Sequence, residues 1–186
     1  DFFAGANTQV SRFENQGEGR SYGLELMLKH EVTKRFYGWV AYTLSKAEQF
    51  FPGEGWRPFI FDQTHNLVVV GSYRWGDGWE TGLRFRLVSG NRTTPVDGAT
   101  FDSDWTTHRP LLGDEFSDRQ SPFNQLDIRV EKQWVFKAWQ LAFYLDVQNV
   151  YFATNPEFTL YDYRFRDSEP VPSVPILPTF GLRGSF

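Results

Sequence analysis

The sequence has no cysteine, a single methionine and only three histidines among its 186 residues. The absence of cysteine excludes a disulfide framework, a thiol nucleophile and a cysteine-ligated metal site. No apolar run approaches the roughly 18 residues that a membrane-spanning helix needs. Basic charge is not in excess either, because 19 Lys and Arg residues are set against 23 Asp and Glu residues. A nucleic-acid-binding domain, which usually carries a basic stripe, is therefore not expected.

Aromatic residues, by contrast, are abundant at 18% of the chain, with 19 Phe, 8 Tyr and 7 Trp. Transmembrane β-barrels need aromatic girdles at both membrane interfaces, and they lack long apolar runs because only every second strand residue faces lipid. Five tryptophans lie beside the short turns between predicted strands: Trp39, Trp75, Trp79, Trp134 and Trp139. This placement is typical of a periplasmic aromatic girdle.

Apolar and polar residues alternate in seven segments, the pattern of strands with one apolar face. The predicted strands cover about residues 18–32, 35–49, 61–75, 78–90, 121–135, 138–152 and 176–186. The fourth is the clearest, with Leu83 and Phe85 on one face and Arg84 and Arg86 on the other. The sequence therefore predicts an all-β fold, an antiparallel meander. A soluble sandwich with a solvated outer face would show the same alternation.

The connections between the predicted strands alternate in length. Short turns fall at residues 32–35, 75–78 and 136–137, and long connections cover residues 50–60, 91–120 and 153–174. In a meander, this alternation places every long connection at the same end of the sheet. Outer-membrane barrels have short periplasmic turns and long extracellular loops. The pattern favours an antiparallel transmembrane β-barrel segment over a soluble sandwich.

Charged side chains occupy the polar face of the predicted strands. They are Glu25, Lys29, Glu80, Arg84, Arg86, Asp127, Arg129, Glu131, Asp146 and Arg183. In a barrel this face is the wall of the lumen. The two signs are nearly balanced, which favours a wall that hydrogen-bonds a globular plug over the open lumen of a general porin, where the charges are often segregated.

The last predicted strand has apolar or small residues at alternate positions up to a final phenylalanine: Phe180, Leu182, Gly184 and Phe186. This pattern resembles the assembly signal of bacterial outer-membrane proteins. The resemblance implies that the barrel-assembly machinery recognises the strand. It also implies that the C-terminus lies on the periplasmic side of the bacterial outer membrane.

Further segments resemble the C-terminal barrel region of TonB-dependent receptors. Residues 13–17, followed by residues 21–26, are similar to the family's Asn-x-Gly stretch and the Gly-apolar-Glu-apolar stretch after it. Residues 61–67 are similar to a common strand opening, residues 145–151 to the penultimate strand, and residues 176–186 to the closing strand. The order and spacing of these motifs cover nearly the whole chain.

The resemblance implies that residues 1–186 are the C-terminal portion of a barrel of about 22 strands, without the family's plug domain. Seven strands cannot close a bacterial single-chain barrel, which has an even number of strands, and unpaired strand edges are costly in lipid. We therefore expect upstream strands and a plug domain, from the same polypeptide or a separate chain. TonB would act through that missing part, and residues 1–12 would be the end of an extracellular loop.

A receptor of this family takes up a scarce nutrient such as a siderophore, cobalamin, an oligosaccharide or a peptide. The loop residues expected to contact it are Trp56, Arg57, Phe59, Arg92, Trp105, His108, Arg109, Tyr161, Tyr163 and Arg164. Trp and Tyr stack on sugars and aromatic rings, and Arg pairs with carboxylates. The same side chains could instead pack the loops together or contact lipopolysaccharide. Outer-membrane lipid is expected along the apolar face.

Other functions stay open from the sequence. A structural or secretion-type barrel subunit completed by a partner chain, or a general porin, would use the same strands. An enzyme is not expected, since Asp62 with His65 is the only pair that suggests catalysis and no nucleophile motif accompanies it. The acidic connection at residues 91–120 could bind Ca²⁺ but lacks the spacing of an EF-hand loop. No catalytic residue, metal or cofactor is expected.

Overall fold

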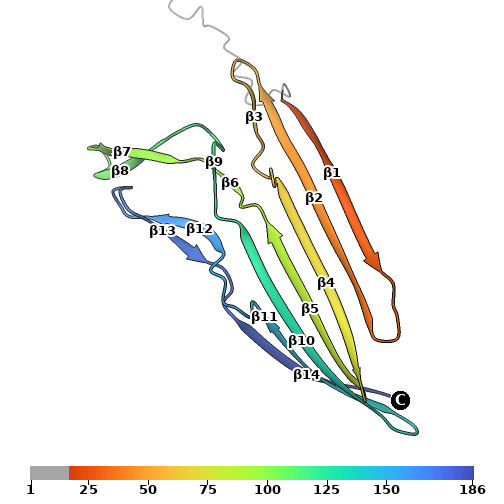
Figure 1. Ribbon diagram of the computed structural model, residues 1–186. Helices are drawn as coiled ribbons and strands as arrows, with labels where there is room; N and C mark the ends of the chain where they lie inside the picture. The colour runs from red at the N-terminus through yellow and green to blue at the C-terminus, as the bar shows by residue number, and fades with distance from the viewer. Residues whose placement is uncertain (1–16) are drawn as a thin grey trace, which may run out of the picture.

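The computed structural model describes residues 17–186, in which seven strands form the continuous path of one antiparallel sheet, and a short eighth strand pairs at its side (Figure 1). In spatial order the seven are β1 (Glu18–His30), β2 (Phe36–Phe51), β4 (His65–Gly76), β5 (Trp79–Val88), β10 (Phe123–Val135), β11 (Gln140–Gln148) and β14 (Leu177–Ser185). Each pairs with the next of these strands along the chain, so the predicted all-β antiparallel meander is confirmed. The predictions for residues 1–12 and 13–16 lie outside the described residues.

None of the elements in residues 17–186 is a helix long and apolar enough to span a membrane.

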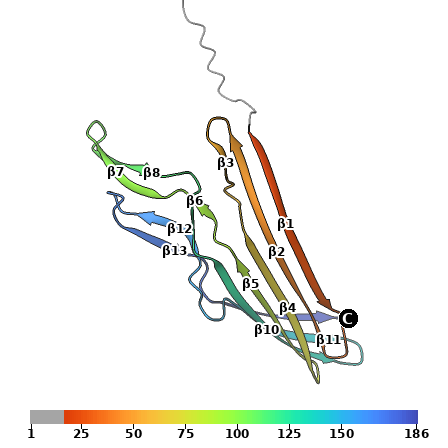
Figure 2. The same cartoon turned by 45° about the horizontal axis from the view of Figure 1, so that its top comes forward.

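The three short turns lie at one end of the sheet and the long connections at the other (Figure 1, Figure 2). The turn between β4 and β5 shows why the chain reverses there. Asp77 and Gly78 both have positive φ angles, 50° and 78°, as a two-residue Asp-Gly hairpin requires. A Cβ atom at Gly78 would lie 2.1 Å from the carbonyl oxygen of Gln133 on β10, so only glycine fits this position.

The long connections contain strands that the alternation pattern did not predict. They are β3 (Gly55–Pro58), which pairs with β2, and the pairs β6 (Arg92–Thr93) with β9 (Asp118–Arg119), β7 (Val96–Asp102) with β8 (Thr107–Leu112), and β12 (Pro156–Tyr161) with β13 (Ser168–Pro172). Their sequences lack one consistently apolar face. In β8, for example, every residue except His108 is exposed.

Cross-strand pairing gives the main sheet one apolar and one polar face, because residues paired across neighbouring strands point to the same side. One row of the apolar face crosses five strands through Leu28, Val40, Val69, Phe85 and Leu126. The next row along, on the polar face, consists of Lys29, Trp39, Val70, Arg84 and Asp127. The faces therefore match the alternation seen in the sequence.

Tryptophans gather at the short-turn end of the apolar face. Trp75 donates a hydrogen bond from Nε1 to Thr81 at 3.0 Å, and Trp79 pairs with Lys132, two residues before Trp134 on β10. Trp39 differs from these residues because it pairs with Lys29 and lies on the polar face. The girdle prediction is wrong for Trp39, because a shift of one residue along a strand moves a side chain to the opposite face.

No second layer covers the apolar face within residues 17–186. Ala142 is the only buried hydrophobic residue there, whereas Leu28, Phe180 and Leu182 are 76%, 77% and 71% exposed. A soluble sandwich buries its apolar faces against one another. An apolar face left open over a whole sheet is instead what contact with lipid requires. The soluble-sandwich alternative therefore has no support in this fold.

Two strand boundaries differ from their predictions by four residues, and the others by at most two. β4 begins at His65 rather than at residue 61, because the backbone turns at Asp62, whose N–H donates to the Phe59 carbonyl at 2.9 Å. β11 ends at Gln148 rather than near residue 152, because Asn149 has a φ of 52°, which is incompatible with a continuing strand. β1 and β14 pair on one side only, so the sheet of the described residues is open.

Candidate functional site

Ion pairs join neighbouring strands across the polar face. Nη2 of Arg84 on β5 lies 2.6 Å from Oδ2 of Asp127 on β10. Asp127 also accepts hydrogen bonds from Nε2 of Gln125 at 2.6 Å and from the backbone N–H of Asn149 at 3.1 Å. The exposed fraction of Asp127 is only 6%. Its buried charge is thus compensated by several donors, as a buried carboxylate requires.

A second group of charges connects β10 to β14 across β11. Glu131 pairs with Arg129 at 2.8 Å and with Arg183 at 3.0 Å. The aromatic ring of Tyr144, on the intervening strand, lies 4.1 Å from the guanidinium carbon of Arg129. The long arginine side chains therefore lie along the face, held by a shared carboxylate and a ring.

Register places every residue predicted for the polar face on that face: Glu25, Lys29, Glu80, Arg84, Arg86, Asp127, Arg129, Glu131, Asp146 and Arg183. A hollow of about 580 Å³ runs along it, lined from Tyr37 on β2 to Arg183 on β14. Within residues 17–186, Nε of Arg86 is a buried donor without a partner, while its Nη2 donates to Gln125 at 3.0 Å. The polar face therefore offers many hydrogen-bonding groups, and its positive and negative charges largely compensate one another.

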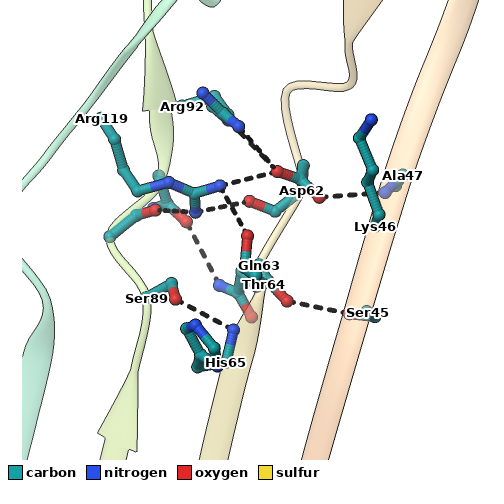
Figure 3. A network of polar contacts seen from close by, with 12 residues as sticks. Ser45, Lys46, Ala47, Asp62, Gln63, Thr64, His65, Ser89, Arg92 and Arg119 are labelled. Carbon is teal, nitrogen blue, oxygen red and sulfur yellow. Dashed lines mark hydrogen bonds and ion pairs between the residues drawn. The ribbon is translucent and has the colours of Figure 1, made fainter. Parts of the chain in front are cut away.

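At the long-connection end, Asp62 is the centre of a polar network (Figure 3). Its side chain is 2% exposed. Oδ1 accepts a hydrogen bond from the backbone N–H of Ala47 at 2.9 Å, and Oδ2 pairs with Arg92 at 3.2 Å and with Arg119 at 2.6 Å. Arg119 also donates to Oγ1 of Thr64 at 3.0 Å. One carboxylate therefore joins the connection before β4 to β2, β6 and β9.

The pKa of Asp62 reflects this arrangement. Burial acts to raise it, but the hydrogen bonds from Ala47, Arg92 and Arg119 outweigh burial and hold the pKa below its ordinary value. Asp62 is consequently ionised at neutral pH. The network fixes the base of the connection between β5 and β10, since Arg92 and Arg119 stand at its two ends.

Asp62 and His65 have separate partners and do not form a catalytic pair. Both carboxylate oxygens of Asp62 are engaged by Ala47 and the two arginines. Nδ1 of His65 is 2.8 Å from the hydroxyl of Tyr42, and its backbone N–H donates to Ser89. The Asp62 carboxylate is therefore not paired with the His65 ring.

Two buried asparagines hold the connection after β11. Asn149, 2% exposed, accepts a hydrogen bond from the N–H of Ala153 at 2.8 Å and donates to the carbonyl of Val174 at 3.3 Å. Asn155, 4% exposed, exchanges two hydrogen bonds of 2.8 Å with the backbone of Asn124 at the start of β10. The connection is therefore attached to the sheet at both asparagines.

Some of the predicted substrate-contact residues meet where the two loop hairpins approach each other. The His108 ring on β8 lies 5.2 Å from Phe101 and 5.9 Å from Tyr163 of the β12–β13 turn. The guanidinium carbon of Arg164 lies 4.9 Å from the Tyr163 ring. Arg109 is held by a 2.6 Å ion pair within its own hairpin. The structure thus brings together His108, Tyr163 and Arg164.

The remaining predicted contact residues lie in different places. Trp56 stacks under Arg20 on the apolar side of β2, and Arg57 pairs with Glu54 and Glu115. Phe59 contacts Phe61, and Arg92 binds Asp62. Trp105 is 74% exposed at the β7–β8 turn, and Tyr161 contacts Phe165. Tyr161 also lines a hollow of about 470 Å³ between the β6–β9 pair and the β12–β13 hairpin. These residues do not form one site within residues 17–186.

The family model described as TonB dependent receptor-like, beta-barrel matches residues 1–150 of the chain. The chain belongs to this family of TonB-dependent receptor barrels. No curated protein and no solved structure matches it. The family match confirms the predicted resemblance, together with the outer-membrane, β-barrel and receptor class. Residues 176–186 lie beyond the matched range, so the likeness of β14 to a closing strand stays a prediction.

A TonB-dependent receptor is a transport protein rather than an enzyme, which agrees with the engaged state of Asp62 and His65. In the described residues no group of three or more His, Asp or Glu side chains is placed to hold a metal ion. The carboxylate of Asp102, in the acidic connection, is bound by Arg109 and by backbone N–H groups. The structure gives the calcium alternative no ligand set.

Sequence reasoning missed two anchoring residues of the receptor, Arg119 and Asn155. Arg119 directly follows residues 114–118, which contain three acidic residues and no cation, and an isolated opposite charge of that kind is a signal that it has a partner elsewhere. Asn155 has no comparable signal, because its importance depends on the approach of Asn124 from another strand.

Proposed function

We propose that this chain supplies barrel wall and extracellular loops to a TonB-dependent outer-membrane receptor for a scarce nutrient: a siderophore, cobalamin, an oligosaccharide or a peptide. The observation that carries the proposal is the sheet itself. It has a single layer, its apolar face is exposed to the surroundings, and its polar face is lined by ion pairs such as Arg84 with Asp127. A sheet of this kind is suited to stand between lipid and a filled polar lumen.

The long-connection end faces the cell surface in this proposal, and the short turns, with the end of β14, face the periplasm. The short turns and the long connections support this orientation, because outer-membrane barrels have short periplasmic turns and long extracellular loops. Trp75, Trp79 and Trp134 beside the short turns support the placement of that end at a membrane interface. Phe180, Leu182 and Gly184 lie on the apolar face of β14, which ends one residue before Phe186. Their recognition by the barrel-assembly machinery stays a prediction.

Further strands must pair with β1 and β14 to complete the barrel, since open strand edges are not tolerated in the hydrocarbon of a membrane. They come from elsewhere in the polypeptide or from a separate chain. A plug domain fills the lumen and contacts the polar face. TonB would act on the plug rather than on this chain.

The loop hairpins are the proposed region of substrate contact. His108, Tyr163 and Arg164 lie together where the β7–β8 and β12–β13 hairpins approach each other. The 470 Å³ hollow beside Tyr161 lies between the β6–β9 pair and the β12–β13 hairpin. Aromatic faces next to a cation can hold sugars, aromatic rings or carboxylates. The network around Asp62 holds the base of one of these loops in position.

The test uses the intact receptor purified from outer membranes. This chain has no cysteine, so a single Gln133→Cys change puts one thiol on the polar face and Met27→Cys puts another near its edge. Cross-linking from position 133 to a plug domain, and uptake that stops without TonB, are the expected results. Leu26→Cys, on the apolar face, is the matched control and should not cross-link. Large stable open channels in conductance recordings would contradict the proposal.

A further inference from the structure

The apolar face of β1 and β2 changes from aliphatic to charged residues toward the long-connection end. Leu24 pairs with Leu44, the next row on the same face is Tyr22 with Lys46, and the row beyond it is Arg20 with Glu48. A strand rises by about 3.3 Å per residue, so successive rows on one face are about 7 Å apart. The charged residues therefore lie directly beyond the apolar band, on the side that faces outward.

Arg20, Lys46 and Glu48 form what we name the outer-rim cluster. Nη2 of Arg20 lies 2.6 Å from Oε2 of Glu48, and Nζ of Lys46 lies 2.7 Å from Oε1. The side chains of the two cations are 46% and 53% exposed, whereas that of Glu48 is 10% exposed. The carboxylate is thus mostly covered and holds two exposed cations side by side, so these three side chains carry one net positive charge, and Glu18 lies one row beyond Arg20 on the same face.

Trp56 fixes one of these cations. The guanidinium carbon of Arg20 lies 4.0 Å from the Trp56 ring, which in turn contacts Phe50 at 5.5 Å. Arginine has five N–H donors and lysine three, so Glu48 uses only part of their capacity. Within residues 17–186, neither Arg20 nor Lys46 is paired with a second carboxylate. The cluster is a preorganised pair of donors that can accept another anion.

We propose that the outer-rim cluster binds a phosphate of the phosphorylated glycolipid in the outer leaflet of the membrane. This inference rests on the proposed function, which places the long-connection end at the cell surface. The cluster continues the apolar face of Leu24 and Leu44, so its ligand has acyl chains beside those residues and an anionic group at the level of Arg20 and Lys46. Paired cations that lie above an apolar surface match that chemistry.

The opposite end of the same face provides a matched comparison. Lys132 is on the apolar face between Trp79 and Trp134, with Nζ 5.3 Å and 5.8 Å from the two rings, and it donates to the carbonyl of Asp77. It is a cation in an aromatic setting but belongs to the short-turn end. It should therefore have no effect on binding of the outer-leaflet glycolipid.

The experiment measures lipid binding to the intact receptor by native mass spectrometry and by titration with fluorescent lipid. The probes are bisphosphorylated lipid A, the same glycolipid without phosphates, and phosphatidylglycerol. The double variant Arg20→Gln with Lys46→Gln should bind the bisphosphorylated glycolipid about 10- to 30-fold more weakly, as expected for loss of two cations near a membrane surface. Lys132→Gln should bind it like the wild type.

The Glu48→Gln variant tests whether lipid binding depends on the two cations themselves or only on the intact structure of the cluster. This variant keeps Arg20 and Lys46 and removes the competing carboxylate, so it should bind the bisphosphorylated glycolipid at least as tightly as the wild type. The mobility shift between unheated and heated samples on gels reports folding for every variant. Weaker binding by Glu48→Gln in a folded receptor would contradict the proposal.

Two other results would overturn the inference. One is unchanged binding of bisphosphorylated lipid A by the double variant. The other is an equal loss of phosphatidylglycerol binding, which would show that the cluster attracts any anionic lipid. Uptake is measured separately. If uptake does not depend on TonB while glycolipid binding still depends on Arg20 and Lys46, the proposed function fails and the lipid site stands.

Discussion

Asp62 and Arg119 are 57 residues apart in the sequence, yet Oδ2 of the aspartate lies 2.6 Å from Nη2 of the arginine. Asp62 lies three residues before β4, and Arg119 belongs to β9, at the end of the connection between β5 and β10. Because Asp62 also binds Arg92, at the start of that connection, both ends of the loop meet at one buried carboxylate. The connection between β5 and β10 is therefore held at its base.

Removal of this carboxylate should loosen the connection between β5 and β10. In Asp62→Ala, Arg92 and Arg119 lose their shared partner, and we expect local stability to fall by about 1–3 kcal/mol. Hydrogen exchange at residues 90–120 of the intact receptor measures the change. Asp118→Asn is the control, because that side chain bonds only the neighbouring backbone N–H. Equal exchange in the two variants would count against the anchor.

The same anchor should respond to acid in a defined direction. The folded pKa of Asp62 is below the ordinary value of 3.8, so its stabilising effect is complete above that pH and is lost only as the pH falls through the lower folded pKa. Exchange at residues 90–120, corrected for intrinsic rates, should be constant from about pH 7 to about pH 5 and rise below the ordinary aspartate range. Asp62→Asn should show fast exchange at every pH. If this variant kept an acid transition of unchanged size, the transition would belong to a titrating group other than Asp62.

Asn149 offers a test of backbone conformation against side-chain bonding. Its φ of 52° suits glycine better than alanine, and its side chain bonds Ala153 and Val174. Asn149→Gly loses only the bonds, whereas Asn149→Ala also gains about 1 kcal/mol or more of backbone strain. Urea unfolding of the receptor in lipid should rank the wild type above Asn149→Gly and Asn149→Ala last. A reversal of the two variants would show that the conformation at this position is different.

Leu26 and Met27 are adjacent, similarly exposed and on opposite faces of β1. Leu26→Arg puts a charge into the apolar band and should destabilise the folded receptor by about 2–4 kcal/mol, whereas Met27→Arg puts the same charge on the polar face and should cost little. Folding titrations into lipid vesicles measure both variants. Equal effects would contradict the assignment of the apolar face to lipid.

Much of the architecture can be predicted because each strand repeats one simple pattern. Leu83 and Phe85 alternate with Arg84 and Arg86, and this period of two is sufficient to predict a strand and its two faces. The hairpins in the connections cannot be predicted in this way because their sequences lack one consistently apolar face. The girdle prediction fails for Trp39 because a position beside a turn does not fix the parity of a residue along its strand.

The candidate site can be predicted only in part, for a physical reason. Alternation along β5 and β10 is local, so the sequence alone is enough to place Arg84 and Asp127 on one face. The 2.6 Å contact between them depends on strand register, which pairs residues 43 positions apart. The same holds for His108 and Tyr163, which the sequence marks only as loop residues of suitable chemistry and which meet because the two hairpins approach.

By itself, the sequence determined the seven long strands of the main sheet, their two faces, the common end at which the long connections lie and the family, because these depend on local periodicity and on short motifs. Only the tertiary structure decided that Asp62 anchors a loop instead of serving catalysis, since its partners Arg92 and Arg119 come from distant segments. It also decided that Arg20 and Lys46 stand together around Glu48 at the border of the apolar band. Burial of a charge and its compensation are set by neighbours in space, and no local pattern records them.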